Sequence, residues 1–308
     1  MKLRIRSYRN ENDYWRIRDF LRRVFLLNRR QELSWQAYRF DYWRWHGIAN
    51  MGHGSLESDV FIWEDEDGEI GAVLNREGPG YAYLQVDPRY KTEELETEML
   101  NKAEDNLAFS KKDERLALNV FAGETDELRQ EILIQRGYAL SETWEHQHSR
   151  MLSGTAPDVV LPDGYRVRSL GDVDELPARS FLSWRAFHPD APLGNYEGWE
   201  WYMNIQRAPL YRRDLDLVVI SPEGEMCSFC TIWFDDTTRA GSFEPVGTSP
   251  EFQRLGLGKA VINEGFSRLI QIGADKAFVG SGSDGASAFY NSIGFTHCDV
   301  TQMWTKTL

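Results

Sequence analysis

The sequence of 308 residues has few of the residues that mark several large classes of protein. Three cysteines, an odd number, do not build a disulfide frame and predict a reducing, cytoplasmic setting. No apolar run approaches the roughly 18 residues of a membrane span, and the charged opening from Met1 to Arg6 is not typical of a signal peptide. Basic residues are outnumbered by acidic ones, 35 to 48, and the resulting net charge of −13 disfavours nucleic acid. We therefore expect neither a membrane nor a nucleic acid partner.

Potential metal ligands are equally sparse. Cys227 and Cys230 form a C-x-x-C pattern, but it lies in a predicted strand, where residues three apart point to opposite faces. His146 and His148 share one face of another predicted strand without a third placed ligand. We therefore predict no metal site and no redox site.

The chain repeats itself. Arg4–Ser7 of the first half reappears as Arg166–Ser169 in the second half. Three further matches follow in the same order at nearly the same offset: Phe25 with Phe187, Asp67-Gly68-Glu69 with Glu223-Gly224-Glu225, and Gly137-Tyr138 with Gly294-Phe295. Four ordered matches with little drift favour two related folds in tandem.

The length fits two domains of roughly 150 residues each. A segment rich in Ser, Gly, Pro and Asp lies between the repeats and is typical of a linker. We therefore expect one domain at residues 1–150, a linker at 151–162 and a second domain at 163–308.

Apolar segments predict the same fold in both halves. They flank the two acidic turns, at Val60–Trp63 and Gly71–Leu74 in the first half and at Leu217–Ile220 and Ser228–Phe234 in the second. Strands mixed with interspersed helices indicate the α/β class, with an α+β mixed sheet in each half.

The most informative stretch is Gln253–Ala260, which reads Gln-Arg-Leu-Gly-Leu-Gly-Lys-Ala between a predicted strand and a predicted helix. Free backbone N–H groups and the positive end of a helix dipole meet at such a loop, so it is suited to phosphate. A nucleotide P-loop needs four residues between its glycines, but one residue separates Gly256 from Gly258. A dinucleotide fingerprint needs a glycine where Val261 stands.

These motifs resemble those of the GNAT family of N-acetyltransferases. The Gln-x-x-Gly-x-Gly pattern resembles the family's acyl-CoA pyrophosphate loop, and Glu244–Gly247 resembles its fourth strand, where a β-bulge splays the sheet. Ser283–Phe295 is similar to the family's N-x-x-A-x-x-x-Y-x-x-x-G-F element, with Ser283 in place of the common asparagine. The resemblance covers residues 165 to 308, and the whole arrangement resembles tandem two-domain members of the mycothiol synthase type. It implies two tandem GNAT-like acyl-CoA N-acyltransferase domains.

The resemblance also implies acetyl-CoA as acyl donor and assigns residues to it. The backbone N–H groups of Val246 and Thr248 would bind the pantetheine arm, since Pro245 has no N–H. The expected acetyl-CoA-binding residues are Val246, Gly247, Thr248, Gln253, Arg254, Leu255, Gly256, Leu257, Gly258, Lys259, Ala260, Ser283 and Ala286.

Acyl transfer to an amine needs one group that takes a proton from the amine and another that gives a proton to the departing thiolate. The resemblance assigns these roles to Glu244 and Tyr290, with the Val246 N–H polarising the thioester carbonyl. A solvated strand-end carboxylate and a core aromatic are the alternative interpretations. We expect Phe289 to fill the core, which leaves Tyr290 to face the cleft. No cysteine is placed as a nucleophile, so a small-molecule amine would attack directly in a ternary complex.

The first half lacks this machinery. Where the second half has its glycine loop, the first half reads Asp87–Leu95, without glycine and with Glu93 and Glu94, which would repel a pyrophosphate. The position that matches Tyr290 is Leu133. We therefore predict a degenerate first domain, structural or substrate-shaping, and a catalytic second domain.

The acceptor side is predicted between the first strand and the hairpin of the second half. Its aromatic residues suit a ring-bearing acceptor, and core packing is the alternative. The segment contains Trp184, Phe187, His188, Asp190, Tyr196, Trp199, Trp201 and Tyr202. The sequence names neither the acceptor nor the acyl length and leaves a homo-oligomer open. A non-catalytic acyl-CoA sensor or scaffold is the alternative function, which the presence of Glu244 and Tyr290 disfavours.

Overall fold

The computed structural model describes residues 3–110 and 115–308, and its contacts divide the chain into two compact units. Unit 1 comprises Met1–Gln147 with Cys298–Leu308, and unit 2 comprises His148–His297. None of the helices described is long and apolar enough to cross a membrane.

Unit 1 is a mixed sheet covered by helices. Its strands follow the order β1-β2-β3-β4-β6-β13, and neighbours are antiparallel except for β4 and β6, which are parallel. The short strand β5 pairs with β6. The elements that begin in this unit are β1 (Arg4–Ser7), α1 (Glu11–Leu27), α2 (Ala37–Tyr42), α3 (Leu56–Asp59), β2 (Val60–Glu64), β3 (Ile70–Arg76), β4 (Tyr81–Val86), α4 (Glu93–Leu107), β5 (Phe109–Ser110), β6 (Leu116–Gly123), α5 (Glu127–Gln135) and β7 (Ala139–Met151).

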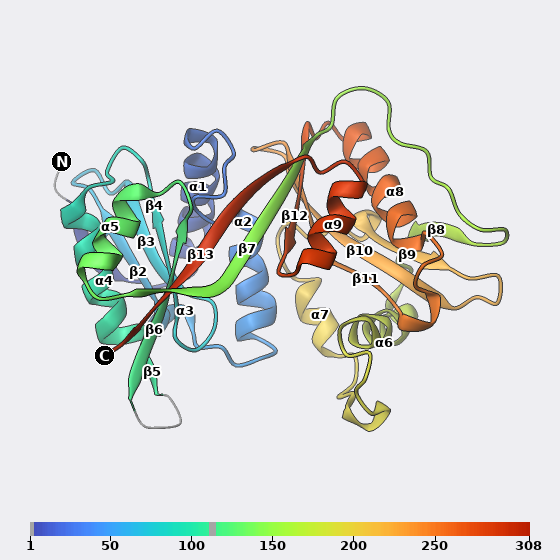
Figure 1. The fold of residues 1–308 in the computed structure, drawn as a ribbon, viewed down its shortest axis with the longest axis horizontal. Coiled ribbons are helices and arrows are strands. Elements are labelled where there is room, and N and C mark those ends of the chain that lie inside the picture. The colour runs from blue at the N-terminus through green and yellow to red at the C-terminus, as the bar shows by residue number, and fades with distance from the viewer. Residues whose placement is uncertain (1–2, 111–114) are drawn as a thin grey trace. The chain divides into compact units, whose positions relative to one another are not determined.

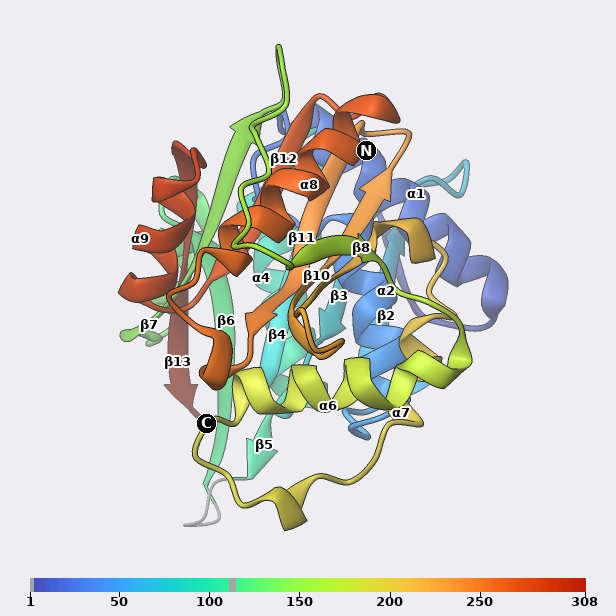
Figure 2. The same ribbon diagram turned by 90° about the vertical axis from the view of Figure 1, so that its right-hand side faces the viewer.

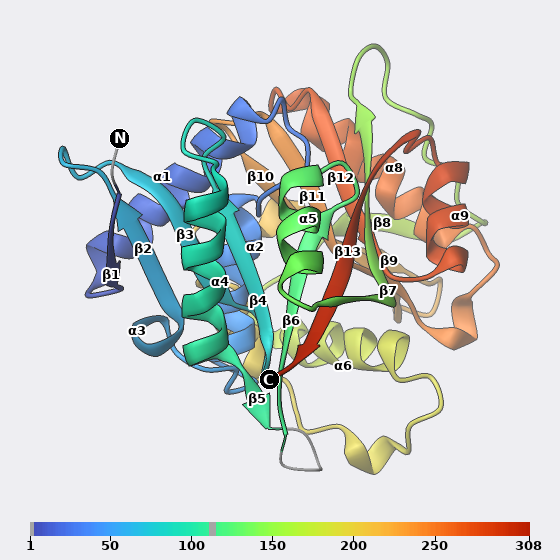
Figure 3. The same cartoon turned by 60° about the vertical axis from the view of Figure 1, so that its left-hand side comes forward.

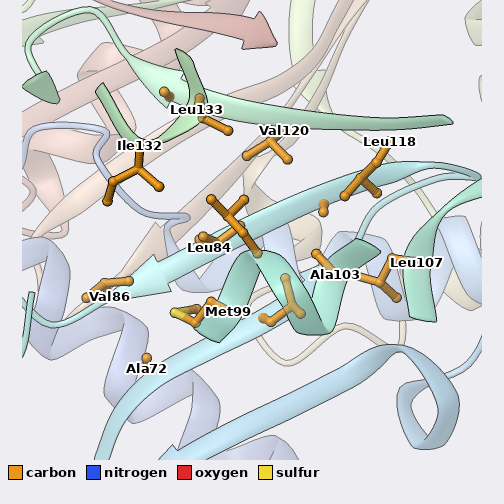
Figure 4. Packing of buried hydrophobic residues seen from close by; sticks show 14 of the residues in the cluster. Ala72, Leu84, Val86, Met99, Ala103, Leu107, Leu118, Val120, Ile132 and Leu133 are labelled. Atoms are coloured by element: carbon orange, nitrogen blue, oxygen red, sulfur yellow. The ribbon is translucent and has the colours of Figure 1, made fainter. Parts of the chain in front are cut away.

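Alternation along the strands gives unit 1 a core on each face of its sheet. Adjacent residues of β2 belong to different clusters: Ile62 packs with α1 and α2, and Trp63 packs with α4 and α5. Figure 3 shows α4 and α5 together on one side of this sheet. Figure 4 shows that cluster, with Met99 of α4 and Leu133 of α5 near the strand residues Leu84 and Val120.

Unit 2 is built the same way. Strands β8, β9, β10 and β11 are joined by antiparallel pairing, and β12 adds in parallel to β11. Its elements are β8 (Arg166–Ser169), α6 (Leu176–Phe187), α7 (Trp201–Ile205), β9 (Asp216–Ile220), β10 (Met226–Asp235), β11 (Ala240–Thr248), α8 (Leu257–Gln271), β12 (Lys276–Ser281) and α9 (Asp284–Ser292), and β13 (His297–Thr307) follows. Figure 1 labels α8, α9 and β12, and Figure 2 shows α8 and α6 beside β10 and β11. The predicted mixed α/β sheet fold is confirmed in both halves.

The two faces of the unit 2 sheet differ in chemistry. On the α8 face the core is apolar and includes Phe243 and Phe266. On the other face α6 buries a guanidinium, because Arg179 donates to Asp216 of β9 (3.2 Å) and Thr231 of β10 (3.0 Å).

Cys227 and Cys230 both lie in the core on the α8 face. The sequence predicted opposite faces for them. A register shift between Met226 and Ser228 breaks the alternation of β10 and accounts for the difference. Burial raises the pKa of both thiols above the ordinary value.

Hydrogen bonds repeat where the sequence repeats. The Arg6 guanidinium donates to the Asp13 carboxylate through both terminal nitrogens (2.7 Å each). Arg168, its counterpart in the second repeat, donates in the same way to Glu175 (2.7 and 2.6 Å). In each unit the same carboxylate also accepts from a backbone N–H four residues before it. The predicted internal duplication is therefore present in the contacts as well.

The last strand of the chain belongs to unit 1. Thr301 to Thr307 of β13 pair with β6, and Trp304 is buried in the α4 and α5 core. The sequence placed residues 298–308 in the second domain because they follow it in the chain. The partner of an edge strand depends on which sheet edge is available, and that information is not local.

Candidate active site

The glycine loop leads from β11 into α8 through two left-handed residues. Arg254 has φ 66° and Gly256 has φ 80°, a region that glycine adopts without steric cost. Gly256 immediately precedes α8, and no side chain of the described residues caps this helix end. Arg254, Gly256 and Lys259 are exposed or partly exposed. The first N–H groups of α8 therefore lack a side-chain partner, which suits an anion such as a pyrophosphate.

Gly258 brings three predicted binding segments to one point. A Cβ atom there would lie 3.2 Å from the Phe289 ring of α9 and 3.4 Å from Oγ1 of Thr248 in β11. A side chain at this position would therefore press on both neighbours. Leu257 and Ala260 are buried in the core, whereas Leu255 is exposed.

The predicted β-bulge is present at Glu244-Pro245. Val246 pairs with Cys230 and Phe243 pairs with Ile232, so two residues of β11 oppose Thr231 alone. The described pairing of β11 with β12 ends at Phe243, although β11 continues to Thr248. The two parallel strands therefore diverge beyond the bulge, as the sequence predicted.

The N–H groups of β11 point in the directions that the predicted pantetheine donors, Val246 and Thr248, require. Ser249 donates its N–H to the Cys227 carbonyl of β10 (3.0 Å). In an antiparallel pair, alternate residues point their N–H groups toward the same neighbour. Gly247 therefore faces β10, and the N–H groups of Val246 and Thr248 face the side where β12 has diverged.

Gly247 also lets α6 approach the strand. A Cβ atom at Gly247 would lie 2.9 Å from the Ala186 Cβ of α6 and 2.7 Å from the Phe229 ring. The end of α6 therefore packs against β11 at Gly247, between the two residues, Val246 and Thr248, whose N–H groups face the side where β12 has diverged.

Tyr290 is 8% exposed and packs in the α8-facing core. Phe289 is 37% exposed, so the prediction that Phe289 would fill the core was wrong. The helix α9 turns Tyr290 inward, where its ring meets Phe295 (centroids 5.9 Å apart) and His148 (6.0 Å). No described residue hydrogen-bonds the Tyr290 hydroxyl.

Burial raises the pKa of the Tyr290 phenol above its ordinary value, and electrostatic interaction with Glu244 and with Cys230 raises this pKa further. These two residues act on the phenol from β11 and β10, far from it in sequence. The phenol therefore keeps its proton at neutral pH, as a general acid must.

Glu244 is partly buried at the bulge. Its backbone carbonyl accepts a hydrogen bond from the indole Nε1 of buried Trp233 (2.5 Å). Trp233 therefore fixes the backbone from which the Glu244 side chain starts. No sequence signal points to this contact, because a strand tryptophan is typical of core packing.

Ser283 caps α9, because its Oγ accepts from the Ala286 N–H (3.2 Å). This local role explains a serine at the start of a helix. Ala286 is partly buried against the α8-facing core.

The aromatic segment predicted for the acceptor side divides into two parts. Tyr202 is core, because it is 1% exposed and donates to Asp216 (2.5 Å). At the surface, the loop residue Tyr196 contacts the rings of Phe181 (5.3 Å) and Trp184 (5.6 Å) on α6. The other members of the segment, Phe187, His188, Asp190, Trp199 and Trp201, are exposed or partly exposed.

Two polar residues near Tyr290 were not singled out for this site from the sequence. His148, 2% exposed, shares hydrogen bonds with the hydroxyls of Ser281 (2.9 Å) and Ser287 (3.3 Å). Arg150 donates to the carbonyl of Ile293, just after α9 (2.7 Å). Their partners lie near the other end of unit 2 in the sequence, so local spacing held no signal.

A family model described as the acetyltransferase (GNAT) family matches residues 176–295. The chain carries a GNAT acetyltransferase domain. The matched part of this acetyltransferase lies within unit 2 and includes Glu244, the glycine loop and Tyr290. The family uses acetyl-CoA as donor.

Two bacterial proteins named mycothiol acetyltransferase are similar over 267 residues, which are 80% of this chain and 76% of theirs. The protein from Paenarthrobacter aurescens is 26% identical and that from Arthrobacter sp. (strain FB24) is 24% identical. Together with the family model, they identify the chain as an N-acetyltransferase enzyme, as the sequence predicted.

Two solved structures share the fold of the whole chain. A GCN5-related N-acetyltransferase from Sphaerobacter thermophilus has a TM-score of 0.68 at 14% identity, covering 99% of this chain and 95% of its own. A tandem GNAT protein from the clavulanic acid biosynthesis pathway has a TM-score of 0.67 at 11% identity, covering 99% and 98%. The predicted tandem GNAT fold is confirmed.

Proposed function

We propose that unit 2 transfers an acetyl group from acetyl-CoA to the amine of a small molecule, by direct attack in a ternary complex. One observation carries this proposal: a helix start without a side-chain cap, a splayed strand and a buried phenol influenced by a carboxylate meet in one unit. Binding a phosphate alone needs only the first of these features.

The binding part of the site is backbone. The N–H groups at the start of α8, from Leu257 onward, would hold the pyrophosphate, and Lys259 adds a positive charge at the same end. The N–H groups of Val246 and Thr248 would bind the pantetheine arm in the splay beside β11. The Val246 N–H would also polarise the thioester carbonyl.

The proton transfers belong to Glu244 and Tyr290. An alkylamine with a pKa near ~10 is mostly protonated at neutral pH, so Glu244 would take a proton from it. The amine nitrogen then bonds to the acetyl carbon, the carbon–sulfur bond breaks, and the Tyr290 hydroxyl gives its proton to the departing sulfur. The nitrogen loses its second proton to the Tyr290 oxygen, so the products are the amide, the free thiol and a protonated Glu244. The raised pKa of Tyr290 supports this role because the phenol is protonated before the reaction.

We propose a mycothiol-type amine as first candidate acceptor, since the relatives are named for mycothiol. The net charge of −13 also suits a cationic amine. The cluster of Phe181 and Trp184 on α6 with Tyr196 of the following loop offers an aromatic surface for a ring-bearing acceptor.

Thiol release from acetyl-CoA across a panel of amines, including an amine precursor of mycothiol, tests the proposal. Tyr290→Phe and Glu244→Gln should each lower turnover by about a hundredfold or more, the usual range for a lost general acid or base. Glu223→Gln, in an exposed hairpin turn of the same unit, is the matched control. Unchanged turnover in both site variants would contradict the assigned roles. Tight CoA binding without turnover of any amine would favour an acyl-CoA sensor instead.

A further inference from the structure

The orientation of α9 decides where the Tyr290 hydroxyl points. This helix has nine residues, and Tyr290 is the one buried member of the described helix. Short helices are marginal without tertiary contacts. The position of α9 therefore depends on the few hydrogen bonds that it makes with other elements.

The start of α9 is held by a buried polar cluster. His148 Nε2 lies 2.9 Å from Oγ of Ser281, the last residue of β12, and 3.3 Å from Oγ of Ser287 in α9. The two hydroxyls lie 2.8 Å apart, so the three groups close a triangle. Ser287 and Tyr290 are three residues apart and lie on the same face of the helix. The cluster therefore fixes the turn that carries Tyr290.

The end of α9 is held by the same strand. Arg150 follows His148 by two residues on β7 and so lies on the same face of that strand. Its guanidinium donates to the Ile293 carbonyl (2.7 Å) and lies 4.7 Å from the Phe266 ring of α8. A cation beside the last carbonyls of a helix is also favoured by the helix dipole. The neighbouring Gly294 leaves room for it, because a Cβ there would lie 2.9 Å from Arg150.

We propose that His148 and Arg150 form a two-point clamp that orients Tyr290 for proton transfer. Both are positioning residues, since they act through α9 and not on the reacting atoms. The inference rests on the proposed role of Tyr290 and extends it to two residues that lie outside the matched family segment. Loss of either anchor lets the helix shift. Misplacement by about 1 Å can cost on the order of a hundredfold in rate.

Three variants of the full chain test the clamp. Their turnover is measured with acetyl-CoA and the best amine of the panel, or as hydrolysis of acetyl-CoA. His148→Phe keeps a ring beside Tyr290 but loses the hydrogen bonds, and Arg150→Met keeps the stem over Phe266 but loses the guanidinium. Ser287→Ala removes one hydroxyl and is the mildest change. We expect kcat to fall about tenfold to a hundredfold for the first two, with KM for acetyl-CoA and CoA affinity within about twofold of the parent.

Three controls separate positioning from general damage. Ser292→Ala removes a hydrogen bond of the same helix, from Oγ to the Phe289 carbonyl (2.6 Å), and should leave kcat unchanged. His148→Gln keeps a group that can bond the serines and should restore part of the rate. In a Tyr290→Phe background, His148→Phe should lower kcat by less than twofold.

The outcomes distinguish the clamp from the proposed function. If Tyr290→Phe keeps full activity, the general acid role falls and the clamp falls with it. If Tyr290→Phe is impaired but His148→Phe, Arg150→Met and Ser287→Ala are fully active, only the clamp is overturned. An equal loss from His148→Phe in the parent and in the Tyr290→Phe background would also overturn it.

Discussion

The helices α4 and α8 occupy matching places in the two units, yet they begin in opposite ways. At the start of α4, Thr92 accepts a hydrogen bond from the Leu95 N–H (3.3 Å), and the first turn carries three glutamates. At the start of α8, Gly256 offers no side chain, and the first turn has no acidic residue. One fold can thus cap the start of this helix with a side chain or leave it without a side-chain cap.

The same contrast holds for the proposed catalytic positions. Counted from the first residue of each strand, Gln85 of β4 corresponds to Glu244 of β11. Leu133 corresponds to Tyr290, since each accepts a backbone hydrogen bond from the residue five positions later (2.9 and 3.2 Å). Leu133 is fully buried in the core shown in Figure 4. Unit 1 therefore carries an amide and an alkyl side chain where unit 2 carries an acid and a phenol.

The opening between β4 and β6 in unit 1 is filled from within. The described pairing of these strands ends at Ala82. Beside β4, Arg39 makes paired hydrogen bonds with Glu77 (2.9 and 2.6 Å) and Glu145 (2.9 and 3.0 Å), and its guanidinium lies 4.9 Å from the Tyr83 ring. A cavity of only about 30 Å³ remains there. In unit 1, side chains of the unit itself thus occupy the space beside β4, the strand that corresponds to the splayed β11 of unit 2.

The largest expected effect comes from giving α8 the start of α4. Gly258→Glu places a carboxylate at the second position of α8, where α4 has Glu94. We expect CoA affinity to fall about a hundredfold, or about 2.7 kcal/mol, because the carboxylate competes for the N–H groups and repels phosphate. Calorimetric titration with CoA measures it. Gly258→Ala separates the crowding of Phe289 from the charge, and Glu94→Gln should leave CoA affinity unchanged. Parent-like binding by Gly258→Glu would remove α8 from the proposed site.

The two helix starts could be predicted from the sequence because they depend on residues that are neighbours in the chain. The glycine spacing, the bulge at Glu244-Pro245 and the recurring Arg-x-Arg-Ser segments depend on neighbours in the chain, and the fold class followed from them. Three features did not follow: the inward turn of Tyr290, the contacts of His148 and the pairing of β13 with β6. Each depends on partners that only the folded sheet brings close, so no spacing rule reaches them.

A smaller effect is expected from giving each unit the side chain of the other, with Gln85→Glu in unit 1 and Glu244→Gln in unit 2. Gln85, 2% exposed, accepts from the Trp35 N–H (2.7 Å) and donates to Asn75 (3.1 Å). Gln85→Glu loses that donor and buries a charge, so we expect unit 1 to lose about 2 kcal/mol of stability. Glu244→Gln should change the stability of unit 2 by less than about 0.5 kcal/mol. Hydrogen exchange of β4 and β11 amides measures each unit separately. Equal shifts in both units would contradict this contrast between them.

The smallest expected effect is a pH dependence confined to unit 1. Burial raises the pKa of Glu32 to about 7, with Asp299 and Glu145 raising it and Gln36 and Arg39 opposing the shift. A carboxyl whose pKa is higher in the folded state than in the unfolded chain binds more protons when folded. Unit 1 should therefore lose stability as the pH rises from about 4.5 to about 7. The full shift would be worth about 3 kcal/mol, but Glu32 is partly exposed and solvent screening reduces the expected loss to on the order of 1 kcal/mol.

Glu32→Gln should flatten that slope because an amide does not titrate. The new amide carbonyl can still accept the hydrogen bond that Gln36 donates to the Glu32 carboxylate in the parent protein (3.0 Å). Exposed Glu98→Gln is the matched control and should keep the parent slope. Hydrogen exchange of β4 amides between pH 5 and 7.5, corrected for the intrinsic rate, gives the slope for unit 1, and β11 amides give the reference. A parent protein whose unit 1 gains stability across this range would show that Arg39 outweighs burial and keeps Glu32 ionised. In that case the interior of unit 1 would be a satisfied ion cluster, and the opening beside β4 would be closed by charge pairing as well as by volume.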